Sequence, residues 1–359
     1  MKEIILLVLF GIIFLNASSQ KSKNVQLKFF PASDENIQYT GRIQFSAAKL
    51  PATPPRFWQP GVYFTARFKG TRCEVILNDQ VLWGKNHNYL EVVVDGKARR
   101  LQTKAAHDTV VVDGLSAGVH SLLVCKNTEA NIGYLELVGI RCKQLVKPLP
   151  KPLRKIEFIG NSITCGAGAD QSEIPCGKGV WQDQHNAYLS YGPTVARALN
   201  AQWSLSSVSG IGLIHSCCNL EIKMPQVFDK IDMRDDSLAW NFSKYQPDVV
   251  TACLGQNDGV QDSTAFCHAY VEFVQRLRNY YPSAQIILLT SPMADATLTA
   301  ALKKYLTAVK TELNKRDGNV DTYFFSKQYH NGCDSHPDLK EHEQIAEELR
   351  IFIRKKMKW

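Results

Sequence analysis

The feature that most constrains the fold is a segment of alternating prolines at Lys147–Pro152, where the residue pattern of the chain changes. Ahead of it, short apolar runs alternate with turn residues and no helical period appears. Behind it, apolar runs typical of strands alternate with amphipathic stretches typical of helices. Alternating prolines favour a stiff, extended connector. We therefore predict two domains in this 359-residue chain, an all-β domain over residues 20–148 and an α/β domain over residues 149–359.

The N-terminal domain is predicted to be a β-sandwich. Its strand-like runs are separated by turn signals, of which Asp95-Gly96 and Asp113-Gly114 are the clearest. Short strands with regular turns and no helical stretch between them are typical of this architecture. The predicted strands are 62–68, 73–77, 90–94, 109–112, 120–125 and 134–140.

The C-terminal domain is predicted to be a parallel sheet covered by helices on both faces, because strands and helices alternate along it. The predicted strands are 156–159, 203–208, 249–254, 286–290 and 322–325, and the predicted helices are 191–199, 265–281, 298–315 and 339–356. In the last helix Ile345, Leu349 and Ile353 recur at steps of four residues, as in an amphipathic helix. In such sheets ligands bind at the carboxyl ends of the strands, so the residues that follow each strand are candidates for the site.

Residues that can supply catalytic groups, from the side chain or the backbone, follow four of the five predicted strands. Ser162 follows the first strand, Gly210 the second and Asn257 the third, while Asp334 and His336 follow the fifth. Because the carboxyl ends of parallel strands meet at one edge of the sheet, these residues can converge on one site.

The residue types at this edge indicate ester hydrolysis. A serine needs a neighbouring base to become a nucleophile, so Ser162 is the predicted nucleophile and His336 its general base. The tetrahedral oxyanion needs hydrogen-bond donors fixed in advance, and the backbone N–H groups of Ser162 and Gly210 with the side-chain amide of Asn257 can supply three. In an extended segment residues two apart point to the same side, so Asp334 is predicted to orient the imidazole of His336.

These segments resemble the consensus blocks of the SGNH (GDSL-like) hydrolase superfamily over roughly residues 153–357, with Ser162, Gly210, Asn257 and His336 at the four named positions. The superfamily places its aspartate three residues before the histidine, where this chain has Cys333. The resemblance therefore leaves a backbone carbonyl as the alternative to Asp334.

With its β-domain and the segments Gly160–Gly166 and Gly332–Pro337, the chain is similar to carbohydrate esterase family 2. The resemblance implies a flavodoxin-like, three-layer hydrolase domain behind a jelly-roll domain. It also implies an acetyl esterase that acts on acetylated xylan or glucomannan. Two alternatives stay open: an SGNH esterase or lipase acting on other small esters, and a carbohydrate-binding protein without activity.

Two further residues are candidates for binding substrate. Trp181 can stack on a sugar ring or pack as an ordinary core residue, and His215 follows Gly210 closely enough to line the same pocket or to be structural. The chain has no C-x-x-C, H-x-H or H-E-x-x-H spacing, so neither a metal nor a cofactor is expected.

The N-terminus is typical of a signal peptide over residues 1–19. Lys2 precedes an apolar run at Ile4–Leu15, and small residues follow it. This run is shorter than the ~18 residues needed to span a bilayer. The basic residues near the linker lack interleaved aromatics, so a nucleic-acid partner is not expected. We expect an exported, soluble monomer, secreted or periplasmic, whose partner is an acetylated carbohydrate.

The ten cysteines leave the disulfide connectivity open. An exported protein can oxidise its thiols. A local bridge between Cys165 and Cys176 is the pairing that the spacing suggests, whereas the adjacent Cys217 and Cys218 are not expected to pair.

Overall fold

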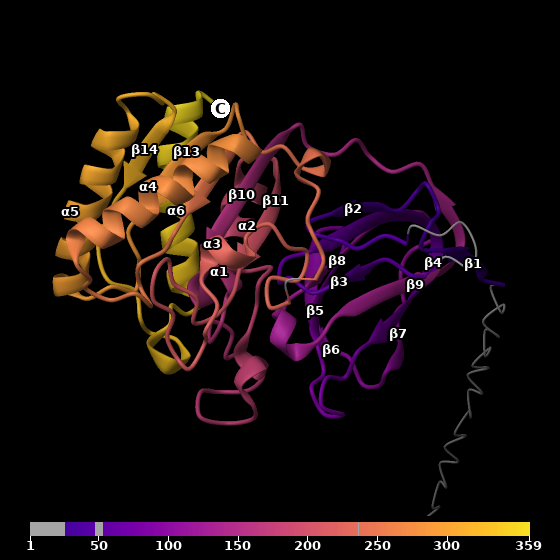
Figure 1. The fold of residues 1–359 in the computed structure, drawn as a ribbon. Helices are drawn as coiled ribbons and strands as arrows, with labels where there is room; N and C mark the ends of the chain where they lie inside the picture. Colours follow the sequence, from indigo (N-terminus) through magenta and orange to yellow (C-terminus); the bar gives the residue numbers. More distant parts are fainter. Residues whose placement is uncertain (1–25, 47–52, 236) are drawn as a thin grey trace, which may run out of the picture.

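The computed structural model describes residues 26–46, 53–235 and 237–359. An antiparallel β-domain and a domain built on a parallel sheet lie side by side (Figure 1). The predicted signal peptide lies outside the described residues. No helix among the described residues is both long and apolar enough to cross a membrane.

The first domain consists of antiparallel strands around one apolar core. Its strands are β1 (Lys28–Pro31), β2 (Gln38–Thr40), β3 (Arg56–Phe57), β4 (Tyr63–Asp79), β5 (Tyr89–Val94), β6 (Lys97–Gln102), β7 (His107–Val112), β8 (Val119–Lys126) and β9 (Leu135–Val146). The long strand β4 contains both of the first two predicted strands and pairs with β2, β7, β8 and β9. Strand β6 was not predicted because four of its six residues are polar or charged and only one, Arg100, is buried.

The second domain has five parallel strands in the order β11-β10-β12-β13-β14, and all five were predicted. They are β10 (Arg154–Gly160), β11 (Ala201–Ser207), β12 (Val249–Ala252), β13 (Gln285–Leu289) and β14 (Val320–Tyr323). The helices are α1 (Ser162–Cys165), α2 (Tyr191–Ala198), α3 (Met224–Val227), α4 (Ser263–Tyr280), α5 (Ala296–Leu313) and α6 (Leu339–Met357). Short 3₁₀ turns interrupt the loops of both domains.

Helices cover both faces of the parallel sheet, which gives the expected three layers (Figure 1). Helices α2 and α6 pack against each other on one face and α4 and α5 on the other. The predicted stripe of Ile345, Leu349 and Ile353 on α6 is fully buried in the first of these layers. The strand order runs in opposite directions on the two sides of β10, so the loops after β10 and β12 diverge and leave a crevice at the carboxyl edge.

Buried polar and aromatic contacts join the two domains. Arg42 of the first domain forms an ion pair with Glu157 of β10 at 3.1 Å, and both side chains are at most 1% exposed. The indole of Trp203 donates a hydrogen bond to the Gly61 carbonyl (2.9 Å) and stacks on Tyr63. Removing one partner from a buried ion pair leaves an uncompensated charge, so separating the two domains is expected to be strongly destabilising.

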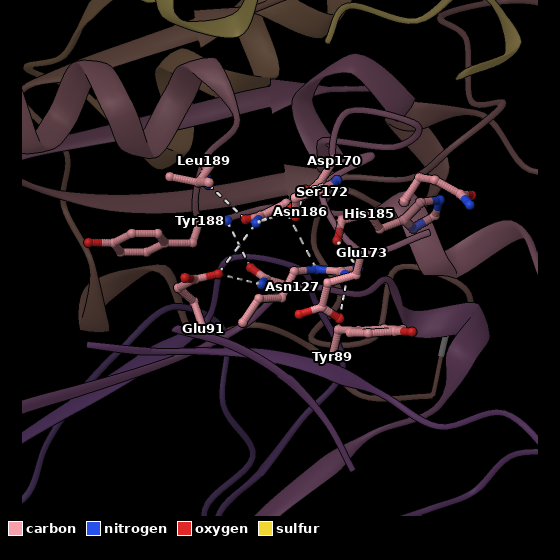
Figure 2. A network of polar contacts seen from close by, with 12 residues as sticks. Tyr89, Glu91, Asn127, Asp170, Ser172, Glu173, His185, Asn186, Tyr188 and Leu189 are labelled. Carbon is pink, nitrogen blue, oxygen red and sulfur yellow. Dashed lines mark hydrogen bonds and ion pairs between the residues drawn. The ribbon is translucent and has the colours of Figure 1, made fainter. Parts of the chain in front are cut away.

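A second set of interface contacts lies between β5, the residue that follows β8, and the loop before α2 (Figure 2). The carboxylate of Glu91 accepts hydrogen bonds from the side-chain amides of Asn127 (3.1 Å) and Asn186 (3.3 Å). The Asn127 side chain in turn accepts from the backbone N–H of Tyr188 (3.0 Å). These residues are buried, and burial raises the pKa of Glu91. The loop that precedes α2 is therefore fixed by the first domain.

Candidate active site

Ser162 lies just beyond the carboxyl end of strand β10, at the first residue of the short helix α1. The side chain of Asn161 caps this helix by accepting a hydrogen bond from the N–H of Ile163 (3.2 Å). A side chain at Gly160 would collide with Thr164, so the turn from strand to helix needs glycine there. This tight turn presents the Ser162 hydroxyl at the crevice.

The structure brings His336 to Ser162 across 174 residues of sequence, with 2.8 Å between Nε2 and Oγ. The other ring nitrogen, Nδ1, lies 3.1 Å from the carbonyl oxygen of Cys333. Because a carbonyl only accepts, Nδ1 carries the proton in the neutral ring and Nε2 presents its lone pair to the serine hydroxyl. The geometry is that of a nucleophile and its base.

Asp334 has a different geometry from the one expected. The segment Cys333–Ser335 is a 3₁₀ turn, not an extended segment, and Asp334 and Ser335 have φ of 51° and 58°. Within the described part of the chain the Asp334 carboxylate makes no hydrogen bond to the ring of His336, and it is exposed at the rim of the cavity. The hydrogen-bond partner of Nδ1 is the Cys333 carbonyl, which is the backbone alternative to Asp334. An orienting role for Asp334 stays a prediction.

The pH dependence of activity is expected to follow His336. Burial penalises the imidazolium and holds the pKa of His336 below its ordinary 6.5, although the Cys333 carbonyl, Asp334 and Glu129 oppose the shift. A general base must be neutral, so kcat/KM is expected to fall only as the pH drops below 6.5. Asp334→Asn removes a negative charge and is expected to move this limb to lower pH still. A profile of kcat/KM against pH for both proteins checks these expectations. If kcat/KM of the wild type already falls at a pH above 6.5, the expectation is contradicted.

The predicted oxyanion donors lie around Ser162. Among the described residues, no hydrogen-bond acceptor takes the backbone N–H of Ser162 or of Gly210. Gly210 has a φ of 82°, a conformation that other residues adopt at a cost. The Asn257 amide donates to the carbonyl of Ile211 (2.8 Å), which orients it and leaves its second hydrogen available.

The loop between β11 and α3 is held by Asp258. Its carboxylate accepts hydrogen bonds from the backbone N–H groups of Leu213, Ile214 and His215 at 2.7–3.0 Å. Asp258 is 3% exposed, so it is a structural acceptor that ties the loops after β11 and β12 together.

An open cavity of about 570 Å³ surrounds the Ser162 hydroxyl. It is lined by Asn131, Ser162, Trp181, Ser209, Gly210, Cys217, Cys218, Asn219, Leu220, Arg234, Gln256, Asn257, Met293, Asp334 and His336. Trp181 is 40% exposed and meets the ring of His185 edge-on, so one side of it is available to a ligand. His215 is exposed outside this lining, with Nδ1 3.4 Å from the carbonyl oxygen of Asn257.

Several cavity residues were not predicted. Asn131 comes from the first domain, and Arg234 from a loop between α3 and β12 without regular structure. Neither has a local sequence signal, because Asn131 reaches the cavity through the packing of the two domains and Arg234 through the path of an irregular loop. Among the described residues no cluster of three or more His, Cys, Asp or Glu could hold a metal ion.

The disulfides differ from the expected ones. Cys176 pairs with Cys333 across 157 residues, while Cys165 is a free, buried thiol in α1. The adjacent Cys217 and Cys218 form a bridge in the cavity wall. Sequence spacing does not reveal this pairing, because Cys176 meets Cys333 through tertiary contact between two loops that are far apart in the sequence.

The Cys176–Cys333 bridge is expected to stabilise the fold. It closes a loop of 157 residues, and a bridge of this kind is typically worth about 2–5 kcal/mol. The double variant Cys176→Ser/Cys333→Ser is expected to lose that much free energy of unfolding in urea titrations. Cys267→Ser, which removes a half-buried free thiol, is the control. An unchanged urea midpoint in the double variant contradicts the prediction.

The fold and the Ser162–His336 pair place the chain in the class of GDSL-like hydrolases, and the sequence comparisons agree. Residues 158–320 match the GDSL-like lipase/acylhydrolase family, and residues 39–152 match the family described as carbohydrate esterase 2 N-terminal. A solved family two carbohydrate esterase from Clostridium thermocellum is 30% identical over 90% of this chain and 99% of its own, with a TM-score of 0.81. The chain belongs to carbohydrate esterase family 2.

Three further relatives are similar over most of this chain. A solved family two carbohydrate esterase from Cellvibrio japonicus is 25% identical, covers 93% of this chain and 99% of its own, and has a TM-score of 0.83. An acetylxylan esterase/glucomannan deacetylase from the same organism is 27% identical over 99% of this chain and 98% of its own length. The cellulase/esterase CelE of Acetivibrio thermocellus is 33% identical, but the chain spans only 40% of that protein.

Proposed function

We propose that this protein is an exported serine esterase that removes O-acetyl groups from plant-type polysaccharides or oligosaccharides such as xylan and glucomannan. The observation that carries the proposal is the 2.8 Å contact of Ser162 Oγ with an imidazole whose other nitrogen donates to a carbonyl. The relative named an acetylxylan esterase/glucomannan deacetylase, similar along both chains, supports the substrate class.

The reaction proceeds through an acyl-enzyme. Ser162 Oγ attacks the acetyl carbonyl while His336 Nε2 takes the serine proton. The oxyanion forms among the N–H groups of Ser162 and Gly210 and the amide of Asn257. The intermediate collapses, the sugar alcohol leaves with the proton from His336, and the acetyl group stays on Ser162. A water molecule, deprotonated by His336, then attacks the acetyl-enzyme and releases acetate and the free serine.

The sugar that carries the acetyl group binds in the 570 Å³ cavity in this proposal. Trp181 offers a partly exposed ring on which the apolar face of a sugar can stack. A role for His215 in substrate binding stays a prediction, and its position outside the cavity lining gives it no support.

A fluorophosphonate probe tests the nucleophile. The wild type is expected to be labelled and Ser162→Ala is not, because the probe reacts with an activated serine. A folded wild type that resists labelling favours the carbohydrate-binding alternative. Acetate release from acetylated xylan, acetylated glucomannan and acetylated hexoses, compared with hydrolysis of longer-chain aryl esters, tests the substrate. Faster turnover of the longer-chain esters favours the general esterase or lipase alternative.

Export and oligomeric state are part of the proposal. Expression with the native N-terminus in a bacterial host, followed by cell fractionation and mass spectrometry, is expected to give an exported form cleaved before Gln20. Size-exclusion chromatography with light scattering is expected to give the mass of a monomer. Retention of an uncleaved chain in the cytoplasm contradicts the export proposal.

A further inference from the structure

The side chain of Glu129 crosses from the first domain into the active-site loops of the second. Glu129 lies between β8 and the 3₁₀ turn Ala130–Ile132 and is 1% exposed. Its Oε2 accepts a hydrogen bond from the backbone N–H of Ser209 (2.7 Å), and its Oε1 accepts from the hydroxyl of the same residue. One carboxylate of the β-domain therefore holds one serine of the hydrolase domain at two points.

The contact with Glu129 matters because Ser209 lies next to a donor of the proposed oxyanion hole. Ser209 immediately precedes Gly210, and the peptide that joins them carries the Gly210 N–H, a donor of the proposed oxyanion hole. Strand β11 ends at Ser207, so sheet hydrogen bonds do not fix this peptide. On the C-terminal side of this peptide, the Gly210 carbonyl accepts a hydrogen bond from the N–H of Cys217 (2.9 Å). Glu129 and Cys217 thus hold the two peptide groups that flank the donor peptide, one on each side.

The segment around Glu129 is itself fixed by the buried side-chain amine of Lys126. Lys126 is fully buried and donates from Nζ to the carbonyls of Thr128 (2.6 Å) and Glu129 (3.0 Å). The ring of His185 lies on another side of the carboxylate, with Nδ1 3.9 Å from Oε1. Burying a carboxylate is costly unless it is paired and hydrogen-bonded, and here most of its hydrogen bonding goes to Ser209.

We propose that Glu129 is a positioning residue for the oxyanion hole, supplied by the β-domain to the hydrolase domain. It orients the Ser209–Gly210 peptide so that the Gly210 N–H points at the developing negative charge. The inference rests on the proposed esterase function and adds that the first domain takes part in setting the rate. Carboxylate acceptors make shorter and stronger hydrogen bonds than neutral ones, which suits a carboxylate to this task.

Kinetics of Glu129→Gln and Glu129→Ala test the proposal. With p-nitrophenyl acetate, kcat is expected to fall about tenfold in the glutamine variant and about 10²-fold in the alanine variant, since one oxyanion donor is worth about 10²–10³ in rate. KM is expected to stay within about threefold, because the interaction strengthens in the transition state. Affinity for methylboronic acid, whose serine adduct mimics the tetrahedral intermediate, is expected to fall in parallel with kcat.

The matched control is Glu91→Gln, which alters another buried interface carboxylate (Figure 2), one that accepts hydrogen bonds from Asn127 and Asn186 and not from Ser209. It is expected to keep kcat within about twofold of the wild type. Thermal unfolding of all variants separates loss of fold from loss of rate. If the alanine variant does not fold, Glu129→Gln and Ser209→Ala, which removes only the hydroxyl contact, carry the test.

A kcat and a boronate affinity near wild-type values in folded Glu129→Gln and Ser209→Ala overturn the inference, as does an equal loss in Glu91→Gln. Failure of the proposed function gives a different result. In that case the wild type itself neither hydrolyses acetyl esters nor reacts with the fluorophosphonate.

Discussion

His336→Ala is expected to lower kcat for acetyl-ester hydrolysis by about 10⁴–10⁶-fold, the range seen when a triad-type base is removed. Nε2 lies 2.8 Å from Ser162 Oγ, and no other side chain in the described part of the chain makes a hydrogen bond to that oxygen. Without the imidazole the hydroxyl keeps its proton and attacks too slowly. Steady-state kinetics and the rate of fluorophosphonate labelling both report the loss.

The same assay on Asp334→Ala separates the two candidates for orienting the ring. We expect a much smaller loss than in His336→Ala, because the Cys333 carbonyl already accepts from Nδ1 at 3.1 Å. Asp334→Asn accompanies it, since asparagine tolerates the positive φ of 51° better than alanine. Equal losses of activity in the His336 and Asp334 variants would show that the Asp334 carboxylate, not the Cys333 carbonyl, orients the His336 ring.

Asn257→Ala is the second large effect, an expected loss of about 10²–10³ in kcat with KM little changed. The Asn257 amide is oriented by the Ile211 carbonyl, so its free hydrogen meets the oxyanion without reorganisation. Binding of methylboronic acid is expected to weaken by a similar factor.

Asn257→Asp is the matched variant, because it keeps the shape of the side chain and replaces the donor with an acceptor. At neutral pH it is expected to lose at least as much activity as the alanine variant, since a carboxylate repels the oxyanion. Equal activity in the wild type and Asn257→Ala, with both proteins folded, would remove Asn257 from the oxyanion hole.

Local sequence pattern was sufficient to predict the second domain. Strands β12 and β13 are buried along their whole length and are mostly apolar, β10 and β11 contain several buried apolar residues, and the helices alternate apolar and polar residues with a helical period. The positions of Ser162, Gly210, Asn257 and His336 followed, because the rule for parallel sheets puts the residues after each strand at one edge. The contact between Ser162 and His336 is the geometry that this reasoning anticipated.

Features that depend on contacts between distant segments could not be predicted. Strand β6 lacks an apolar pattern because only one of its residues is buried. The partner of Cys176 is 157 residues away, and Glu129 reaches Ser209 across 80 residues and a domain boundary. The turn at Asp334 depends on two consecutive positive-φ residues that have no glycine to signal them. Each of these is set by tertiary packing, not by propensity.

The buried Arg42–Glu157 pair limits how this enzyme scaffold can be miniaturised. Glu157 lies in the middle of β10, where it also accepts hydrogen bonds from Ser206 (2.5 Å) and Tyr281. Cutting the chain at the proline linker would leave an anion inside the catalytic half with no cation beside it. A trimmed biocatalyst would first need Glu157 replaced by a neutral residue of similar volume.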